Sequence, residues 1–380
     1  QYPFAKLNGE QPDPVVVWCS NDYLGMSQHP TVREQMHLAL ETYGAGSGGS
    51  RNIGGSYELY ERLEASLADW HDKEAALVFP TGFGSNDATL QCLLRQIPDC
   101  VVISDALNHA SIVNGIRATP NERQVFRHND VEHLAQILSR YPIGQPKLVV
   151  FESIYSMDGD IAPIADIVEV AKRFNALTYL DEVHAVGMYG ARGAGIAAEL
   201  DLVDKIDIIQ GTMAKAIGVI GGYIASTRVI VDAVRSFATG FIFTTSLPPA
   251  VTAGCLASVE HLKSSDDERQ KLQINTALLR ERLKQHDIPV MPCSKTHVLP
   301  VLVGDAERCK VAALRLLHTH GVYLQPINYP SVPVGTERFR VNATPNHSQA
   351  QIENLAVCLR ETFDHFAIPL ASKTSTSEVA

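Results

Sequence analysis

The chain has 380 residues and a formal net charge of −10, so it is long enough for two domains and is a poor candidate for non-specific binding to nucleic acid. Hydrophobic residues make up 45 % of it and charged residues 19 %, a composition typical of globular rather than disordered proteins. Its seven cysteines form no CxxC pair and its apolar runs are interrupted, so we expect no disulfide framework, no bound metal and no membrane span.

The amino-terminal part predicts one short strand and two helices. "QYPFAKLNGEQPDP" lacks the apolar core of a signal peptide, so we expect a cytoplasmic chain of bacterial type that is trimmed before Gln1. "VVVWC" predicts a strand. "HPTVREQMHLALETYG" predicts a helix that ends at Gly44, and "SYELYERLEASLADWHD" predicts an amphipathic helix that opens at Ser56.

Short apolar runs then alternate with helical segments. The runs are "AALVF", "CVVISD", "QVFRH", "KLVVFES", "LTYLDE", "DIIQG" and "GGYIAS". This alternation predicts an α/β fold with a mostly parallel central sheet that helices cover on both faces. After about residue 255 the pattern changes to that of a smaller α+β domain. We therefore predict an N-terminal segment (1–22), a large catalytic domain (23–255) and a C-terminal domain (256–380).

In an open α/β sheet, ligands bind at the carboxyl ends of the strands. After one strand, Thr81, Gly82 and Phe83 precede a helix, which is typical of an anion site and equally of a simple strand-to-helix turn. After the next strand, His109 lies close to Ser111 in "ISDALNHASIVNG". An isolated histidine of this kind is either a functional group or a satisfied loop residue, and the pattern alone leaves both open.

Two further strand ends carry acidic residues. "FESIYSMDGDIAP" contains carboxylates and hydroxyls, Glu152 among them, but their spacing is not that of an EF-hand loop, so we predict no metal there. Asp181 ends a buried strand, His184 follows it, and the next strand leads to Lys215 in "GTMAKAIG". Asp181 and Lys215 could form a plain ion pair. Together with the anion site, they favour a pyridoxal phosphate (PLP) site, in which Lys binds the cofactor and Asp pairs with its ring nitrogen.

Longer motifs resemble one known family, the α-oxoamine synthases, which are PLP enzymes of fold type I. The matching stretches are "WCSNDYLGM", "GAGSGGSRNIGG", "LNHASIVNGIR", "FRHND", "SMDGD", "DEVHAVGMYGARG", "GFIFTTSLPP" and "INYPSVP", and they cover almost the whole chain. The resemblance implies a homodimer with shared active sites, and PLP, glycine and an acyl-CoA as ligands. It also implies no membrane or nucleic-acid partner.

The resemblance assigns roles to individual residues. Lys215 would carry PLP, Asp181 would pair with the pyridinium nitrogen, His184 would contact the phenolic oxygen, and His109 would stack on the ring. The further cofactor contacts would be Gly82, Phe83, Ser156 and Thr212, with Thr244 and Thr245 from the neighbouring subunit. The substrate contacts would be Asn21, Ser50, Arg51, Asn52, Ile53, Ser104, Ser331 and Arg340, with Arg340 clamping a carboxylate.

Within the family, "RNI" favours the branch that condenses glycine with succinyl-CoA to 5-aminolevulinate, a precursor of haem and other tetrapyrroles. The 8-amino-7-oxononanoate synthases typically carry His-Val after the Arg. Ser50 and Ser331 stand where Thr is usual, Ala214 where Gly is usual and Val334 where a basic residue is common. These departures leave open a sister enzyme with another acyl-CoA or amino acid.

Two more distant alternatives also remain. An aminotransferase would release a keto acid instead of CoA and CO2. A nicotinamide-dependent oxidoreductase would need GxGxxG after its first strand, and "GAGSGG" matches that spacing without an immediate helix after it.

Overall fold

The computed structural model describes residues 3–6 and 14–373. The chain forms two compact units, which are described separately. The larger unit comprises Met26–Tyr155 and Ala162–Asp266. The smaller unit comprises the residues up to Gly25, the short segment Ser156–Ile161 and the chain from Asp267 onward. Both units are therefore discontinuous in sequence, whereas the predicted domains are contiguous ranges, and those ranges remain a prediction.

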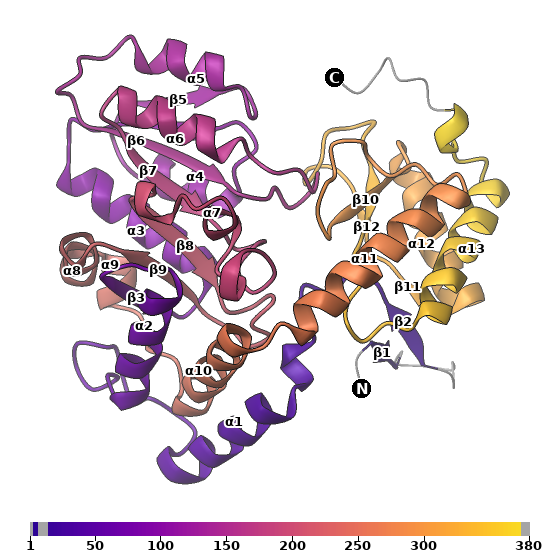
Figure 1. The fold of residues 1–380 in the computed structure, drawn as a ribbon, viewed down its shortest axis with the longest axis horizontal. Helices are drawn as coiled ribbons and strands as arrows, with labels where there is room; N and C mark the ends of the chain where they lie inside the picture. Colours follow the sequence, from indigo (N-terminus) through magenta and orange to yellow (C-terminus); the bar gives the residue numbers. More distant parts are fainter. Residues whose placement is uncertain (1–2, 7–13, 374–380) are drawn as a thin grey trace. The chain divides into compact units, whose positions relative to one another are not determined.

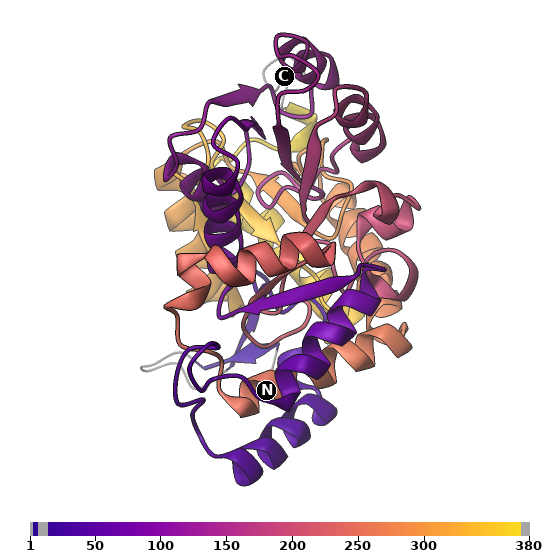
Figure 2. The same ribbon diagram turned by 90° about the vertical axis from the view of Figure 1, so that its left-hand side faces the viewer.

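The larger unit is built on a seven-stranded sheet of order β3-β9-β8-β7-β6-β4-β5, which lies between helices in both views (Figure 1, Figure 2). All seven predicted apolar runs form its strands, and β9 pairs antiparallel while the other neighbouring pairs are parallel. The strands are β3 (Ala75–Phe79), β4 (Val101–Asp105), β5 (Arg123–Phe126), β6 (Lys147–Glu152), β7 (Leu177–Asp181), β8 (Ile208–Thr212) and β9 (Gly222–Ser226). The predicted mostly parallel α/β sheet is thus confirmed.

Both faces of this sheet are buried, because consecutive residues of its central strands point to opposite faces and nearly all are inaccessible. Side chains of α3, α4, α8 and α9 form one continuous core with alternate residues of the strands. The helices of this unit are α1 (Pro30–Tyr43), α2 (Glu58–Trp70), α3 (Gly82–Gln96), α4 (Ala110–Arg117), α5 (Val131–Leu138), α6 (Ile164–Arg173), α7 (Ile196–Glu199), α8 (Arg228–Phe237), α9 (Thr239–Ile242) and α10 (Pro249–Ser264).

The two predicted amino-terminal helices are present, with one corrected boundary. Helix α1 ends at Gly44 as predicted, and its Gly44 N–H donates to Leu40 O from a left-handed φ of 81°. Helix α2 begins at Glu58 rather than at Ser56. Ser56 does not cap the helix because its Oγ donates to Arg51 O and accepts from Arg51 Nε.

The smaller unit combines short strands with three helices, which is α+β architecture. Strands β10 (Leu299–Leu302), β13 (Arg338–Val341) and β12 (Pro326–Ile327) form one antiparallel sheet. β2 (Val15–Val17) pairs with β1 (Phe4–Ala5) and β11 (Val322–Tyr323), so the amino-terminal strands belong to this unit. The core packs these strands and Trp18 against α11 (Asp267–Gln285), α12 (Ala306–His320) and α13 (Gln349–His365). Within the described residues, no helix is long and apolar enough to cross a membrane.

Candidate active site

Two neighbouring parallel strands deliver Asp181 and the turn of Lys215 to one edge of the large sheet. β7 ends at Asp181, which lies in register with Gln210 of β8. β8 ends at Thr212, and a tight turn follows in which Gly218 N–H donates to Lys215 O and Met213 N–H to Gly221 O. Lys215 is half-buried in this turn. Strand direction therefore brings the two predicted residues to one place, as the rule for parallel sheets requires.

Asp181 is a buried carboxylate, 2 % exposed, with two hydrogen-bond donors and the ionisable side chains of Lys215 and His109 near it. Asn86 Nδ2 donates to its Oδ2 at 2.8 Å, and Val183 N–H donates to its Oδ1 at 2.9 Å. Burial raises the pKa of Asp181, and Asn86, Val183, Lys215 and His109 all oppose that rise. The structure thus brings Lys215, His109 and Asp181 into one electrostatic cluster.

A chain of hydrogen bonds links Asp181 to His109 and fixes the tautomer of that histidine. A carboxylate only accepts, so Asn86 presents its amide NH₂ to Asp181, and its Oδ1 accepts from Tyr179 at 2.8 Å. The same NH₂ donates to Ser111 Oγ at 3.1 Å, and that oxygen lies 2.7 Å from His109 Nδ1, to which the hydroxyl donates because the Ser111 backbone N–H already makes Nδ1 an acceptor. Ser111 N–H also donates to Nδ1. Neutral His109 therefore carries its proton on Nε2, the outward nitrogen.

The pKa of His109 is lowered, chiefly by desolvation and further by the charge of Lys215, while Asp181 acts in the opposite direction. The residue is exposed and caps the amino terminus of α4. A neutral imidazole with an outward N–H can donate a hydrogen bond to a ligand. His184 is buried in the turn after Asp181. Its predicted contact with the cofactor stays a prediction.

The predicted anion site is the amino terminus of α3. Thr81 caps this helix of 15 residues, its Oγ1 accepting from Gly84 N–H. A Cβ on Gly82 would lie 2.8 Å from Thr212 Oγ1, so the glycine leaves the space between the helix end and the end of β8 open. Helix N-terminal N–H groups beside a hydroxyl form a cradle for phosphate, and the side chain of Phe83 is exposed beside it. The residues present therefore fit the phosphate of PLP.

The predicted acyl-CoA segment is anchored by Arg51. Its Nη1 and Nη2 donate to Glu64 at 2.8 and 3.1 Å, and the guanidinium lies over the Tyr60 ring, 3.8 Å from its centroid. Arg51 is buried, whereas the neighbouring Asn52 and Ile53 are exposed. The structure thus shows Arg51 holding its own loop, and any contact of this segment with substrate stays a prediction.

Other predicted residues of the larger unit lie in polar turns. Ser50 forms an isolated β-bridge with Thr245, which joins two predicted motifs that are far apart in sequence. The Thr244 hydroxyl donates to Gly240 O at 2.6 Å, and Thr245 is exposed. Ser104 is buried and accepts from Asn108 Nδ2 at 2.8 Å. The roles assigned to these residues are not tested by such contacts.

In the smaller unit, Arg340 and Asn21 meet. Arg340 Nη2 donates to Asn21 Oδ1, and the Tyr23 hydroxyl donates to the same oxygen at 3.1 Å. Burial lowers the pKa of His297 to about 3 and Arg340 adds to the effect, so this neighbouring histidine is neutral. Sequence reasoning assigned no role to Tyr23, although it lies within the motif "WCSNDYLGM", and it missed His297, which none of the matching motifs contains.

Ser156 and Ser331, also predicted contacts, lie in this unit. Ser156 opens the segment that Arg338 holds, with Arg338 Nη1 donating to Asp158 Oδ1 at 2.7 Å. Ser331 is exposed in a turn where its N–H donates to Asn328 O. Their predicted roles near the ligands remain predictions.

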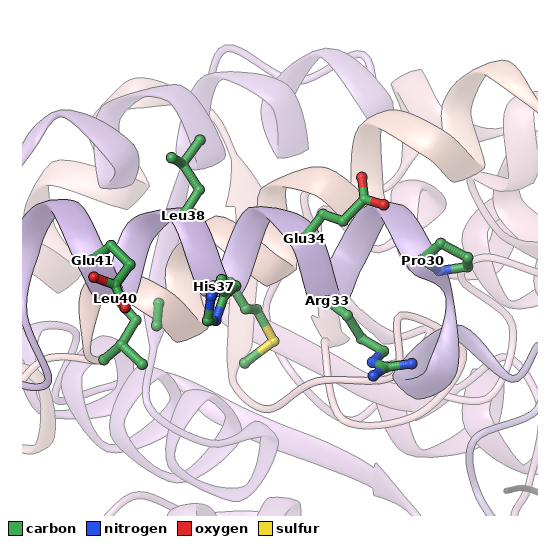
Figure 3. Close-up of a pocket in the computed structure, with 9 residues that line it drawn as sticks. Pro30, Arg33, Glu34, His37, Leu38, Leu40 and Glu41 are labelled. Atoms are coloured by element: carbon green, nitrogen blue, oxygen red, sulfur yellow. The ribbon is translucent and has the colours of Figure 1, made fainter.

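A cavity of about 820 Å³ lies along α1, which packs on α10, and its lining includes none of the predicted site residues. Arg33, His37 and Leu40 follow one another along one side of the helix, as spacings of four and three residues require (Figure 3). Leu38 and Leu40 are 58 % and 43 % exposed. This surface therefore combines exposed leucines with the charged or polar side chains of Arg33, Glu34, His37 and Glu41.

Glutamine at position 182 will remove a pH dependence of stability. Burial raises the pKa of Glu182 from 4.5 to about 7, although the nearby Ser153 side chain and the N–H groups of Ala197 and Ile196, which donate to the carboxylate, oppose the rise. Between these two pH values the native state holds a proton that the unfolded chain has released, so stability falls as the pH rises from 4.5 to 7. This shift in pKa corresponds to a loss of about 3 kcal/mol in the free energy of unfolding as the pH rises through this range.

Urea unfolding at several pH values between 4.5 and 7.5 measures this slope. In E182Q, the free energy of unfolding will fall less between pH 4.5 and 7 than in wild type, because the contribution of Glu182 is gone. Glu132→Gln, a change at an exposed glutamate, will keep the wild-type dependence on pH. Identical slopes in E182Q and wild type would show that Glu182 does not hold the proton.

Comparisons with known proteins agree with this geometry. The family model described as Aminotransferase class I and II matches residues 13–359. The chain is 50 % identical over 364 residues to 5-aminolevulinate synthase of Bradyrhizobium diazoefficiens, covering 96 % of this chain and 89 % of that protein.

Solved structures are also similar. Serine palmitoyltransferase of Sphingomonas wittichii superposes with a TM-score of 0.91 at 30 % identity, over 97 % of this chain and 91 % of that chain. A high-resolution structure of SPT with its PLP internal aldimine superposes with a TM-score of 0.90 at 32 % identity, over 94 % of this chain and 90 % of that chain. The predicted fold and family are thus confirmed, and the chain belongs to the 5-aminolevulinate synthases, within the aminotransferase class I and II family of PLP enzymes.

Proposed function

We propose that the chain condenses glycine with succinyl-CoA to form 5-aminolevulinate, CoA and CO₂, with PLP bound covalently at Lys215. The observation that carries this proposal is the cluster of Lys215, Asp181 and His109 at the carboxyl ends of the parallel strands. The identity to curated 5-aminolevulinate synthases supports the choice of reaction. An aminotransferase or an oxidoreductase is not favoured by any comparable observation.

The residues that would hold PLP fall into two groups. The α3 amino terminus, Gly82 and Thr212 would bind the phosphate, and Asp181 would bind the protonated ring nitrogen. When bound, PLP supplies an electron sink that stabilises negative charge on the carbon next to the substrate amino group. Asn86 and Val183 keep Asp181 oriented and ionised for this partner.

Lys215 and His109 would handle protons and charge during the reaction. Lys215, which lies on a short turn and interacts electrostatically with Asp181 and His109, would remove a proton from the Cα atom of glycine and return it to the product. His109, neutral with its proton on Nε2, would donate to the oxygen that becomes negative when the thioester is attacked. Both roles need the nitrogen atoms of these side chains and not merely their volume.

Arg340 would bind the carboxylate of glycine. A guanidinium forms a bidentate pair with a planar carboxylate, and Asn21 holds Arg340 through its side-chain oxygen. The Tyr23 hydroxyl fixes that oxygen in turn. The arrangement selects an amino acid with a free carboxyl group.

Acyl-donor selectivity would depend on Ser50 and Ser331, each of which lacks the methyl group that Thr carries. One methylene of pocket space discriminates only about 10–200-fold between substrates. A CoA-release assay with glycine and a panel of acyl-CoA thioesters therefore tests the donor. We expect fastest release with succinyl-CoA and equimolar 5-aminolevulinate. No release with succinyl-CoA beside fast release with another thioester would establish a sister reaction instead.

We also propose that the enzyme is a cytoplasmic homodimer with shared active sites. Support comes from large apolar side chains that a single chain leaves exposed, among them Leu38, Leu40 and Tyr43 of α1 and Phe243 after α9. Phe243 directly precedes Thr244 and Thr245, which the family resemblance assigns to the neighbouring subunit's cofactor. The molar mass in solution at assay concentration measures the oligomeric state.

A further inference from the structure

Strands β6 and β7 end on two carboxyl groups that lie side by side. Glu152 and Asp181 are the last residues of these strands and are paired in the parallel register. Each is 2 % exposed. Residues two positions earlier, Val150 and Tyr179, pack in the core under α3 and α4, so both carboxyl groups point to that same face. Sequence reasoning considered Glu152 only as a metal ligand and did not place it beside Asp181.

The surroundings of the two carboxyl groups differ. Asp181 accepts from Asn86 and Val183 and lies near Lys215. Glu152 Oε1 accepts from the backbone N–H of His109 at 2.5 Å. Burial raises the pKa of Glu152 well above its ordinary value, Asp181 and Asp105 raise it further, and the His109 N–H and Lys215 oppose the rise.

A further titratable neighbour, Tyr155, gives Glu152 no positive charge. The Tyr155 hydroxyl lies 3.4 Å from the backbone nitrogen of Glu152, and burial raises the pKa of this tyrosine well above 10, so its ring is neutral. Two adjacent buried carboxyl groups cannot both ionise without strong repulsion, and the better-solvated one keeps the charge. Here that group is Asp181, since it accepts from two donors, Asn86 and Val183, whereas Glu152 accepts from the His109 N–H.

These contacts close into a ring. The chain of hydrogen bonds runs from Asp181 through Asn86 and Ser111 to the His109 side chain, and the His109 backbone returns to Glu152, the strand neighbour of Asp181. His109 is therefore held at two points. Its ring is set by Ser111 and its backbone by Glu152.

We propose that Glu152 is a positioning residue that is protonated in the resting enzyme and holds His109 through its backbone N–H, so that Asp181 is the single anion of this strand-end pair. The proposal rests on the function proposed above, because it assigns His109 a place in the site. When Glu152 is neutral, Asp181 is the only negative charge of the pair and can bind the protonated ring nitrogen. The hydrogen bond from the His109 backbone to Glu152 also keeps His109 Nε2–H directed outward. Ionised Glu152 would add a second negative charge beside Asp181, with Asp105 near it.

Infrared difference spectroscopy in H₂O and D₂O tests the protonation. The wild-type protein at pH 8.5 will show the carbonyl band of a buried protonated carboxyl group, and E152Q will lack it. E182Q is the matched control, since Glu182 titrates near pH 7 and contributes no such band at pH 8.5. A wild-type protein without the band, or a band that persists in E152Q, would overturn the proposal.

The positioning role is tested by comparing E152Q with E152L. Gln keeps a carbonyl acceptor for the His109 N–H, and Leu has a similar volume without one. We expect kcat to fall less than about threefold in E152Q and at least about tenfold in E152L, the scale of one lost buried hydrogen bond. ¹⁵N spectra of ring-labelled histidine will show the Nε2–H tautomer of His109 in wild type and E152Q, and a mixture in E152L.

Equal losses of kcat in the two variants, or an unchanged His109 signal in E152L, would contradict the positioning role. The infrared and ¹⁵N measurements need no turnover. If the proposed reaction failed, the wild-type protein would form no 5-aminolevulinate while the spectra stayed as expected. If this proposal failed, the wild-type protein would be active, and the spectra or the comparison of kcat in E152Q and E152L would differ from expectation.

Discussion

Replacing Lys215 with alanine will lower kcat for 5-aminolevulinate formation by at least about 10²–10⁴-fold, the range that a positioned acid–base group supplies. The change removes both the amine that takes the Cα proton and the group that binds PLP covalently. The visible absorbance of the lysine-bound cofactor will disappear as well. Stopped-flow or steady-state rates together with absorbance spectra of the PLP-loaded protein measure both effects.

Lys205→Ala is the matched control, because Lys205 is exposed and precedes β8 while Lys215 follows it. The control will keep wild-type rate and absorbance. A Lys215→Ala protein with near-normal turnover would show that another group handles the proton, and the proposed mechanism would have to be abandoned.

Replacing Asp181 with asparagine will weaken PLP binding and lower kcat by about 10²–10³-fold, as expected when one member of a buried charge pair is removed. An amide has one acceptor oxygen, so it cannot accept from both Asn86 and Val183 and also present charge to the ring nitrogen. Titration of the apoprotein with PLP gives the affinity, and saturating PLP isolates the effect on kcat.

Asp204→Asn, at an exposed position on the same approach to β8, will leave the PLP affinity unaltered. If Asp181→Asn bound PLP as tightly as wild type and kept its rate, the ring nitrogen would not need this carboxylate. The placement of the cofactor in this cluster would then be wrong.

Much of the larger unit could be predicted because local patterns determine it. Each of the seven apolar runs forms a strand, and the central strands read as apolar runs because both of their faces are buried. Gly44 ends α1 because the chain turns there through a left-handed φ. The meeting of Asp181 and Lys215 follows from strand direction alone, because parallel strands carry their carboxyl ends to one edge.

The contacts that the sequence could not predict depend on register and on long-range pairing. Glu152 lies beside Asp181 only because β6 and β7 pair without a shift, and no spacing in the sequence specifies that register. Arg51 turns inward to Glu64, whose position on α2 comes from packing, and this pairing also moves the start of α2 past Ser56.

The sequence also could not show which segments of the chain form the smaller unit. Strand β2 pairs with β11, more than 300 residues later in the chain, so the amino-terminal strands join the carboxyl-terminal unit. A local pattern identifies each strand but contains no information about its partner. For the same reason the contact between Arg340 and Asn21 could come only from the family resemblance.

The central claim is that the turn after β8 holds PLP through Lys215. Borohydride reduction of the PLP-loaded wild-type protein, followed by peptide mass spectrometry, tests it most directly. We predict that the phosphopyridoxyl label appears on the peptide containing "GTMAKAIG" and maps to Lys215, with about one label per chain. A label on a different lysine, or a fully loaded protein without any reducible link, would contradict the assignment of this site.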